Sequence, residues 1–412
     1  MLSINSNRVN VRVAIVSLAA ASAGLSMAAM SLGKLFLLLT VLLVLLRNSH
    51  KAIGQVSWQA LWTPKLVIVI LAAFAGSLLW TTGPFDQDME AVGKYGKLLV
   101  IPALLILIRS RQEATLALTI FLGFQTFLLL SSWLLYFHVP VVWASGKHAK
   151  EFFAVFSTYL DQSIISAVVA ALFWHLKALA PNRLLFYGAI AISLLALGSV
   201  FFVFVGRTGQ LVGLTMVGLA VFWALPRRYR LASIVMTPLI PILAFSLGAI
   251  PQRFVIAGSE VSSYMDKPAA NTSTGIRLYF WKTSLEAMAQ KPLAGSGVGS
   301  WTTEYNKIER RKNADFEVFK VASNPHQEFL LWGVQLGVGG VLLLMALMGA
   351  VMKDFHKMDP PVARAGQSIV AALVVSCLFN SSLYDANIGS FFCLSIGVML
   401  AYGLYAGNTS HR

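Results

Sequence analysis

Three side chains have the types and positions that chemistry on a phosphate-linked substrate requires at a membrane surface. Arg207 stands between two apolar runs, Arg277 lies in a long polar segment, and His326 stands where the next apolar run begins. A planar guanidinium binds phosphate oxygens in two places, so two arginines on one face suit a pyrophosphate. A neutral imidazole accepts a proton near pH 7. The set predicts anion binding by the arginines and a general base at His326.

Both arginines also have a simpler interpretation. An arginine in hydrocarbon costs about 2.5–3.5 kcal/mol at mid-bilayer and less near an interface, and Arg207 could reach lipid phosphate by snorkelling. As an anion ligand it would gain from the dipole of a helix expected to begin at about Thr208. Arg277 is expected in the first turn of a helix, where a cation is unfavourable unless an anion binds. Its alternative is a solvated surface arginine.

His326 is expected in the first turn of a membrane helix. Asn324 is a favoured N-cap, Pro325 suits the first helical position, and Gln327 can complete a capping box. The helix dipole there disfavours imidazolium, so we expect the ring to be neutral near pH 7. The simpler interpretation is an interfacial histidine without a chemical role.

Other charged side chains on the same predicted face carry weaker signals. Asp86-Gln87-Asp88 has the spacing of a metal-binding carboxylate pair, and a polar loop explains it equally well. Lys94 and Lys97 either add phosphate contacts or anchor a helix end. Asp161 and Asp385 are helix-end acids to which the sequence assigns no partner. No P-loop, GxSxG, HExxH or CxxC pattern occurs, so ATP hydrolysis, serine hydrolysis and zinc chemistry have no support.

The elements that must position these residues are membrane helices. The chain is 57% hydrophobic and 12% charged, about half the charge of a soluble domain. This composition predicts an all-α polytopic membrane protein, in which runs of about 17–25 apolar residues span the bilayer. We expect about twelve transmembrane helices, at roughly 11–30, 32–46, 65–82, 97–109, 114–137, 161–179, 184–205, 208–225, 231–249, 326–351, 365–382 and 388–406.

One long polar loop interrupts these runs and divides the chain into three regions. Residues 1–250 hold nine helices, residues 251–325 form the loop, and residues 326–412 hold three more. Within the loop we expect an amphipathic helix at 274–290, a glycine-rich turn and a second helix at 301–312, both helices lying at the membrane surface. Ser273 or Thr274 would cap the first helix, whose apolar stripe is Ile276, Tyr279, Phe280, Leu285 and Met288.

The distribution of Lys and Arg over the short loops sets the orientation. One side holds most of these residues, so both termini are expected in the cytoplasm and the long loop outside. Only Glu113, Asp354 and Asp359 among the acids fall on the cytoplasmic side. The net charge of +15 suits anionic lipid or phosphate partners. Cys377 and Cys393 fall in apolar runs and are expected to be free thiols.

This arrangement resembles the O-antigen ligase family, the WaaL-type branch of the O-antigen ligase/polymerase superfamily. The resemblance is in the twelve runs, the one large late loop and three short segments. These segments are Gly206-Arg207-Thr208-Gly209, then Gly275-Ile276-Arg277 with Trp281 and the glycine turn from Pro292 to Trp301, and finally Asn324 to Leu330. In the last, His326-Gln327-Glu328-Phe329-Leu330 fits the family's His-(Asn/Ser/Gln)-x-x-Leu pattern.

The resemblance implies a glycosyltransferase of the GT-C class in the inner membrane, with its active site facing the periplasm. Such enzymes transfer a polysaccharide from undecaprenyl pyrophosphate to the lipid A–core oligosaccharide in lipopolysaccharide biosynthesis, with inversion and without metal or other cofactor. Arg207 and Arg277 would hold the donor pyrophosphate, and His326 would deprotonate the acceptor. The basic run Arg310-Arg311-Lys312 would help recruit the acceptor, although a solvated charge run explains it too.

Several alternatives stay open at the level of sequence. An O-antigen polymerase or a protein O-oligosaccharyltransferase of the same superfamily would share the donor and differ in the acceptor. A secondary transporter is the alternative from another class, because twelve spans are common there. The sequence does not fix the acceptor, the sugar specificity or the oligomeric state. Besides membrane lipids, the expected partners are these two glycolipids, and nucleic acid is not among them.

Overall fold

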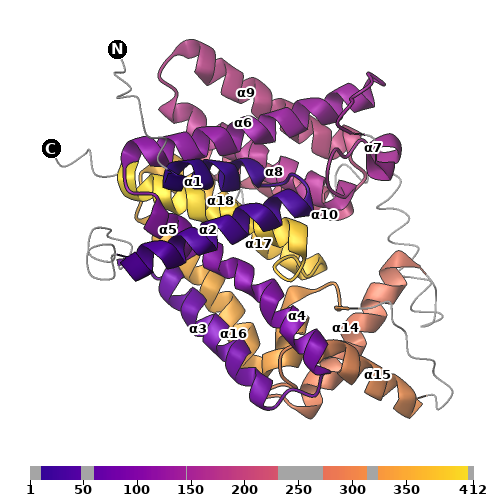
Figure 1. The fold of residues 1–412 in the computed structure, drawn as a ribbon. Coiled ribbons are helices and arrows are strands. Elements are labelled where there is room, and N and C mark those ends of the chain that lie inside the picture. The colour runs from indigo at the N-terminus through magenta and orange to yellow at the C-terminus, as the bar shows by residue number, and fades with distance from the viewer. Residues whose placement is uncertain (1–10, 48–59, 145, 231–271, 313–322, 407–412) are drawn as a thin grey trace.

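The computed structural model describes residues 11–47, 60–144, 146–230, 272–312 and 323–406, and every regular element in these ranges is helical. The helices form one bundle (Figure 1). The expected span at 231–249 and much of the long loop lie outside the described residues. Seven helices in the described ranges are long and apolar enough to cross a membrane: α2 Met27–Arg47, α6 Arg111–Tyr136, α8 Tyr159–Leu176, α9 Arg183–Gly198 with its π-helical extension Ser199–Val203, α16 Glu328–His356, α17 Pro360–Phe379 and α18 Ala386–Ala406.

Some of the expected spans are shorter or divided differently. The run at 11–30 breaks at Gly24, whose φ of 78° turns the chain between α1 (Val11–Ser22) and α2. At 1.5 Å per residue α1 is only about 18 Å long, so it does not cross hydrocarbon alone. The run at 97–109 becomes a short 3₁₀ segment, Gly96–Leu99, followed by α5 (Val100–Leu107). α3 (Thr63–Gly76) and α10 (Arg207–Ala224) complete the bundle.

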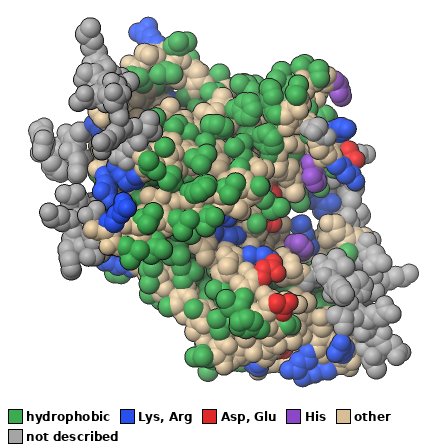
Figure 2. All heavy atoms as spheres, in the orientation of Figure 1, with side chains coloured by type: hydrophobic (Ala, Val, Ile, Leu, Met, Phe, Trp, Pro, Cys, Tyr) green, Lys and Arg blue, Asp and Glu red, His purple; other side chains and the backbone are tan. Residues whose placement is uncertain are grey.

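The surface has the distribution that a membrane slab requires. Figure 2 shows hydrophobic side chains over the middle of the visible face, with Lys and Arg gathered toward its two ends. α2 contributes an exposed apolar row along its length: Leu32, Leu35, Phe36, Leu39, Leu42, Leu43 and Leu46. Exposed leucines in such a row are stable only against lipid or another apolar surface. The two cysteines, Cys377 and Cys393, are free and buried, as expected.

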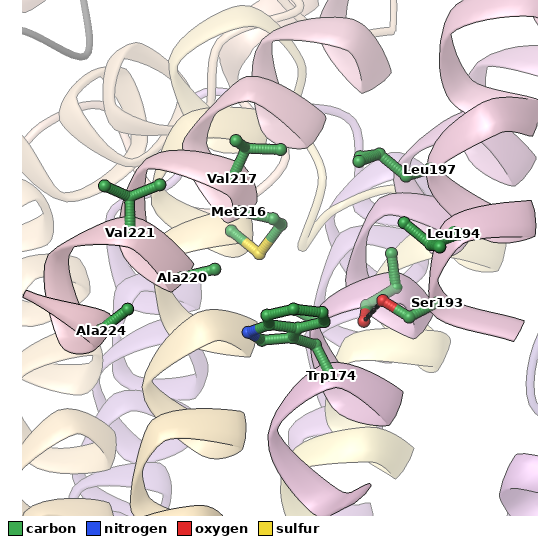
Figure 3. Close-up of a pocket in the computed structure, with 11 residues that line it drawn as sticks. Trp174, Ser193, Leu194, Leu197, Met216, Val217, Ala220, Val221 and Ala224 are labelled. Carbon is green, nitrogen blue, oxygen red and sulfur yellow. Dashed lines mark hydrogen bonds between the residues drawn. The ribbon is translucent and has the colours of Figure 1, made fainter. Parts of the chain in front are cut away.

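An apolar cavity of about 260 Å³ lies between α8, α9 and α10. Figure 3 shows Trp174 of α8, Leu194 of α9 and Met216 of α10 pointing into it. The Ser193 hydroxyl in its wall already donates to the carbonyl oxygen of Ala170 at 2.8 Å. No charged side chain lines this cavity, so it suits hydrocarbon rather than chemistry on phosphate.

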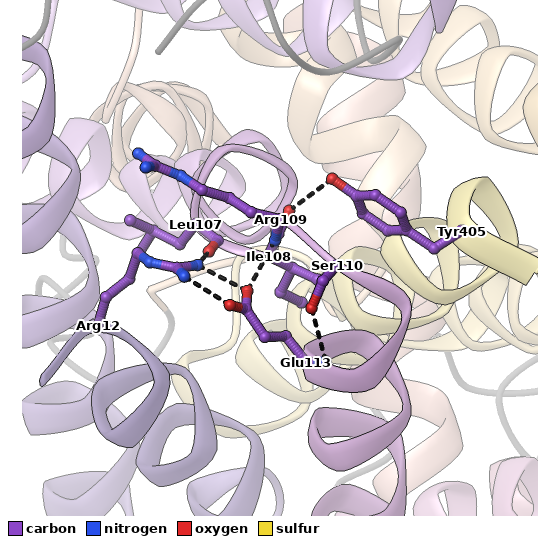
Figure 4. Close-up of polar contacts among 7 residues, drawn as sticks. All are labelled: Arg12, Leu107, Ile108, Arg109, Ser110, Glu113 and Tyr405. Atoms are coloured by element: carbon purple, nitrogen blue, oxygen red, sulfur yellow. Dashed lines mark hydrogen bonds and ion pairs between the residues drawn. The ribbon is translucent and has the colours of Figure 1, made fainter. Parts of the chain in front are cut away.

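A polar cluster ties several helices together at one end of the bundle (Figure 4). Arg12 of α1 pairs with Glu113 of α6 through two hydrogen bonds, one of 2.7 Å, and also donates to the carbonyl oxygen of Leu107. Tyr405 near the end of α18 donates to the carbonyl oxygen of Ile108 at 3.1 Å. α1 therefore begins, and α18 ends, at the same end. This is the end that the Lys and Arg distribution predicts to be cytoplasmic.

The opposite end is built around a break in α16. Gly337 has φ 64° and ψ −155°, so the helix loses internal hydrogen bonds there. The glycine-rich turn of the long loop replaces them: Ser296 N donates to Val334 O at 2.8 Å, and Val338 N donates to Pro292 O at 2.7 Å. A break in a membrane helix needs such partners because lipid offers none.

The same turn also holds the segment before α4 (Phe85–Tyr95). Thr82 N donates to Ser296 O at 2.9 Å, and the Thr81 hydroxyl donates to Val298 O at 2.8 Å. A Cβ at Gly297 would lie 2.3 Å from the Cα atom of Thr81, so only glycine allows this approach. The long loop is thus docked into the bundle through its backbone.

Candidate functional site

The start of α10 and the start of the loop helix α14 (Ser273–Gln290) lie against each other. Arg207 is the first residue of α10 and donates from Nη1 to the Thr274 hydroxyl at 3.0 Å. Thr272, not Ser273 or Thr274, caps α14, accepting from Gly275 N at 3.0 Å. The predicted convergence of Arg207 with the loop helix is therefore present, across 67 positions of sequence.

Arg277 reaches the same place from α14. Its Nη1 donates to the carbonyl oxygen of Phe379, at the end of α17, at 3.5 Å. The next residue, Asn380, donates to the Thr208 hydroxyl at 3.3 Å. Because α14 begins at Ser273, Arg277 stands in its second turn, so the expected cost of a cation in the first turn is smaller than predicted. Both arginines are half-buried where three helix ends meet.

His326 precedes its helix instead of lying in the first turn. α16 begins at Glu328, and Gln327 is the N-cap, its side chain accepting from Leu330 N. His326 itself has φ 53°, a left-handed backbone that histidine adopts more readily than most residues. Asn324 holds this turn by accepting from His326 N at 2.9 Å. The prediction of Asn324 as N-cap was wrong, because its side chain closes the turn before the helix.

The surroundings of His326 favour a neutral imidazole for a reason other than the helix dipole. The ring lies nearly parallel to that of Phe280 of α14, with centroids 6.4 Å apart. Partial burial and then the charge of Arg277 lower the pKa of His326, while the Asp385 carboxylate acts in the opposite direction. His326 is exposed at the surface, and Arg277 lies within electrostatic range of its ring.

Two buried residues hold the wall of this site: Glu328, to which sequence reasoning gave no role, and Lys97, which it considered for phosphate contacts or for anchoring a helix end. Glu328 accepts from Leu383 N at 2.8 Å and from Tyr384 N at 3.1 Å. Lys97 donates to the carbonyl oxygens of Tyr384 and Asp385. The loop between α17 and α18 is thus held by the Glu328 side chain, which accepts from its N–H groups, and by the Lys97 ammonium, which donates to its carbonyl oxygens. The sequence signal for Glu328 was an acidic residue at the start of an apolar run, where a charge is costly unless it has a partner.

Asp385 and Asp161 find partners that the sequence did not reveal. Asn387 donates through its side chain to Asp161 at 3.0 Å and through its backbone to Asp385 at 2.9 Å. The start of α8 is thereby fixed to the start of α18. One carboxylate in this network, that of Asp385, acts on His326.

Residues 202–345 match the family model described as O-antigen ligase. The matched segment contains Arg207, Arg277 and His326. This segment belongs to the O-antigen ligase superfamily. A protein of Haemophilus influenzae (strain ATCC 51907 / DSM 11121 / KW20 / Rd), described as an uncharacterized protein, is 26% identical over 155 residues, which are 35% of this chain and 37% of that protein.

The Asp-x-Asp pair lies outside the O-antigen ligase segment, and its two carboxylates have different surroundings. It lies in α4, not in a loop as expected. Asp86 is exposed, whereas Asp88 is buried beside Gly299 and accepts from the Thr81 hydroxyl at 3.2 Å. Within the described ranges no three His, Cys, Asp or Glu side chains group in a way that could hold a metal ion.

The basic run within the O-antigen ligase segment is only partly available to a ligand. It ends α15, which spans Trp301–Lys312 as expected. Lys312 pairs with Glu286 at 2.9 Å and Glu309 at 3.4 Å. Arg311 donates to Gln290 at 3.3 Å, and Arg310 is exposed. The predicted cluster of three cations is therefore reduced to two, because Lys312 connects α15 to α14.

The apolar stripe expected on α14 is partly buried, with Tyr279 and Phe280 packed against the core. Ile276 is 41% exposed and Leu285 is 56% exposed. The buried positions are small or hydroxylated: Gly275, Thr283, Ser284 and Ala287. Small side chains let α14 approach α16 closely, and this approach brings Phe280 beside His326.

Proposed function

We propose that this chain is an O-antigen ligase that transfers polysaccharide from undecaprenyl pyrophosphate to the lipid A–core oligosaccharide. Arg207 and Arg277 meet at the ends of α10, α14 and α17, and His326 lies beside Phe280 of α14. This arrangement of residues from distant segments carries the proposal. The superfamily match over 202–345 supports glycosyl transfer.

In this reaction the acceptor hydroxyl attacks the anomeric carbon of the donor. The new bond joins the acceptor oxygen to that carbon, and the bond from the carbon to the pyrophosphate oxygen breaks. The hydroxyl proton passes to His326, and Arg207 and Arg277 stabilise the charge that develops on the leaving pyrophosphate. Direct displacement inverts the anomeric configuration. No step in this scheme requires a metal ion.

The wider setting belongs to the same proposal. We place the chain in the inner membrane as a GT-C-like enzyme with about twelve spans, with the loop at 251–325 and the site facing the periplasm. Arg310 and Arg311 are exposed cations near the end of α15 that would attract the phosphates of the acceptor. Lys312 acts with Glu286 and Glu309 in the packing of the loop helices.

An O-antigen polymerase or a protein O-oligosaccharyltransferase would use the same donor site. The broken helix α16 resembles a feature of secondary transporters but does not favour that function. Transporters line a central path with broken helices, but the break at Gly337 is filled by the glycine turn of the chain itself.

Lipopolysaccharide banding tests the proposal. A strain lacking the gene should make intact core without O-antigen, and the wild-type chain should restore the ladder. A variant lacking the guanidinium of Arg207 or the imidazole of His326 should fail to restore it at equal membrane abundance. Core carrying a single repeat would instead identify a polymerase. An unchanged ladder in the deletion strain would contradict both assignments.

A further inference from the structure

A cavity lined by cations lies at the same end of the bundle as His326. It has a volume of about 390 Å³ and opens between α2, α4 and the start of α18. Lys34, Lys94 and Lys97 line it together with one acid, Glu90. Figure 2 shows positive and negative side chains gathered between the start of α2 and α4. A volume of this size is typical of a binding pocket.

The charges in this cavity do not balance. Lys94 pairs with Glu90 at 2.8 Å. Lys34 instead donates to the Ser390 hydroxyl at 2.8 Å, and Lys97 donates to backbone carbonyls. Neither of these two lysines makes an ion pair within the part of the chain that the structure describes. The two ammonium groups repel each other. Glu328 and Asp385 offset part of this repulsion at Lys97, and an anion between Lys34 and Lys97 would offset it further.

The surroundings indicate what kind of anion would enter. Leu38 and Leu99 share the cavity wall with the lysines. The exposed row of α2, which includes Leu35, Leu39 and Leu42, continues from Lys34 along the bundle. A lipid with a negative headgroup could therefore place the headgroup against the lysines and its hydrocarbon chains against the leucines of α2. A soluble anion could contact only the lysines.

We propose that the Lys34–Lys94–Lys97 cavity binds the phosphate headgroup of a membrane lipid, whose chains lie along α2. This site is separate from the Arg207–Arg277 pair. The loop between α17 and α18 contacts both sites. Its carbonyl oxygens accept from Lys97, and the carboxylate of its Asp385 acts electrostatically on His326. The site does not depend on the proposed glycosyl transfer.

The test uses the purified full-length chain in neutral detergent and follows its thermal unfolding as lipid is added. A ligand that binds only the folded state raises the midpoint. The probes are phosphatidylglycerol, a polyprenyl pyrophosphate, lipid A, neutral diacylglycerol and inorganic pyrophosphate. The variants are Lys34→Gln, Lys94→Gln and their combination, with Lys150→Gln as the control, because Lys150 is an exposed lysine of α7 (Lys147–Phe152).

At least one phosphate lipid should bind the wild-type chain and the control equally. Each cavity variant should weaken that binding by about 10–100-fold. The phosphate lipid with the strongest lysine-dependent affinity identifies the source of the headgroup. Lys97 is left unchanged because it also supports the loop. Equal lipid affinity in the double variant and the control would overturn the proposal. The proposal would also be overturned if diacylglycerol or inorganic pyrophosphate bound as tightly as every phosphate lipid.

Discussion

His326 has a left-handed backbone, so a substitution by glycine can remove its side chain without straining its conformation. Glycine adopts φ 53° without strain, whereas other residues pay about 1–2 kcal/mol there. We expect His326→Gly to keep the folded stability of the wild type within about 1 kcal/mol, because relief of strain offsets the added freedom of the unfolded chain. Its kcat should fall by about 10²–10⁴-fold through loss of the general base. Thermal unfolding and an assay with purified donor and acceptor measure the two effects, and wild-type turnover would remove His326 from the mechanism.

The pH dependence of the rate reports the protonation state in which His326 works. Partial burial and Arg277 lower its pKa from 6.5, so the ring is mostly neutral at pH 7. A general base is active when unprotonated, so kcat should fall as the pH is lowered through a pKa below 6.5. This limb should be absent from His326→Gly. If imidazolium instead bound the donor phosphate, the rate would rise on acidification, and a profile from pH 5 to 8 separates the two.

Neither alanine nor lysine should replace Arg207 or Arg277 in the transfer reaction. Arg207→Ala and Arg277→Ala should abolish transfer at normal abundance, and the lysine variants should recover little of it. One ammonium cannot make the paired contact of a guanidinium with pyrophosphate. Arg228→Ala is the matched control, because Arg228 follows the far end of α10 and contacts the ring of Tyr229. Full activity in both site alanine variants would refute the assignment.

At the scale of elements, the loop, the segment before α4 and the broken helix α16 depend on one glycine turn. Gly297→Ala would place a Cβ 2.3 Å from Thr81 at a φ of 89°, so we expect a loss of about 1–3 kcal/mol in unfolding free energy. Gly349→Ala in the second part of α16 meets no atom within 4 Å and should be neutral or stabilising. Thermal unfolding of both variants in detergent measures the difference. Equal midpoints would show that the turn does not support α16.

At the scale of the whole molecule, the bundle has two chemically different ends. Arg12, Glu113 and Tyr405 join α1, α6 and α18 at one end, and the candidate site lies at the other. We expect reporter fusions at Asn313 and at Arg412, two positions outside the described residues, to report opposite sides of the membrane. Asn313 directly follows α15 at the site end, whereas α18 ends beside Arg12. Reports from the same side would reject both the topology and the periplasmic site.

Local patterns in the sequence determined much of the helical architecture. Apolar runs, a late polar loop and turn residues predicted an all-helical membrane protein and the bounds of α15, because these features depend on neighbours within one turn. They also predicted that Arg207, Arg277 and His326 share one face, although their roles came from the resemblance to O-antigen ligases. The charge pattern assigned Arg12 and Glu113 to one side, and the structure pairs them.

Only the tertiary structure decided how the site is built. His326 lies just before α16, whose first residue, Glu328, accepts from Leu383 N, 55 positions away. The break at Gly337 is stable only because a distant turn supplies hydrogen bonds. The lysine cavity likewise joins α2, α4 and α18. Each of these features depends on partners brought together by folding, and hydrophobic periodicity carries no information about which buried polar groups will meet.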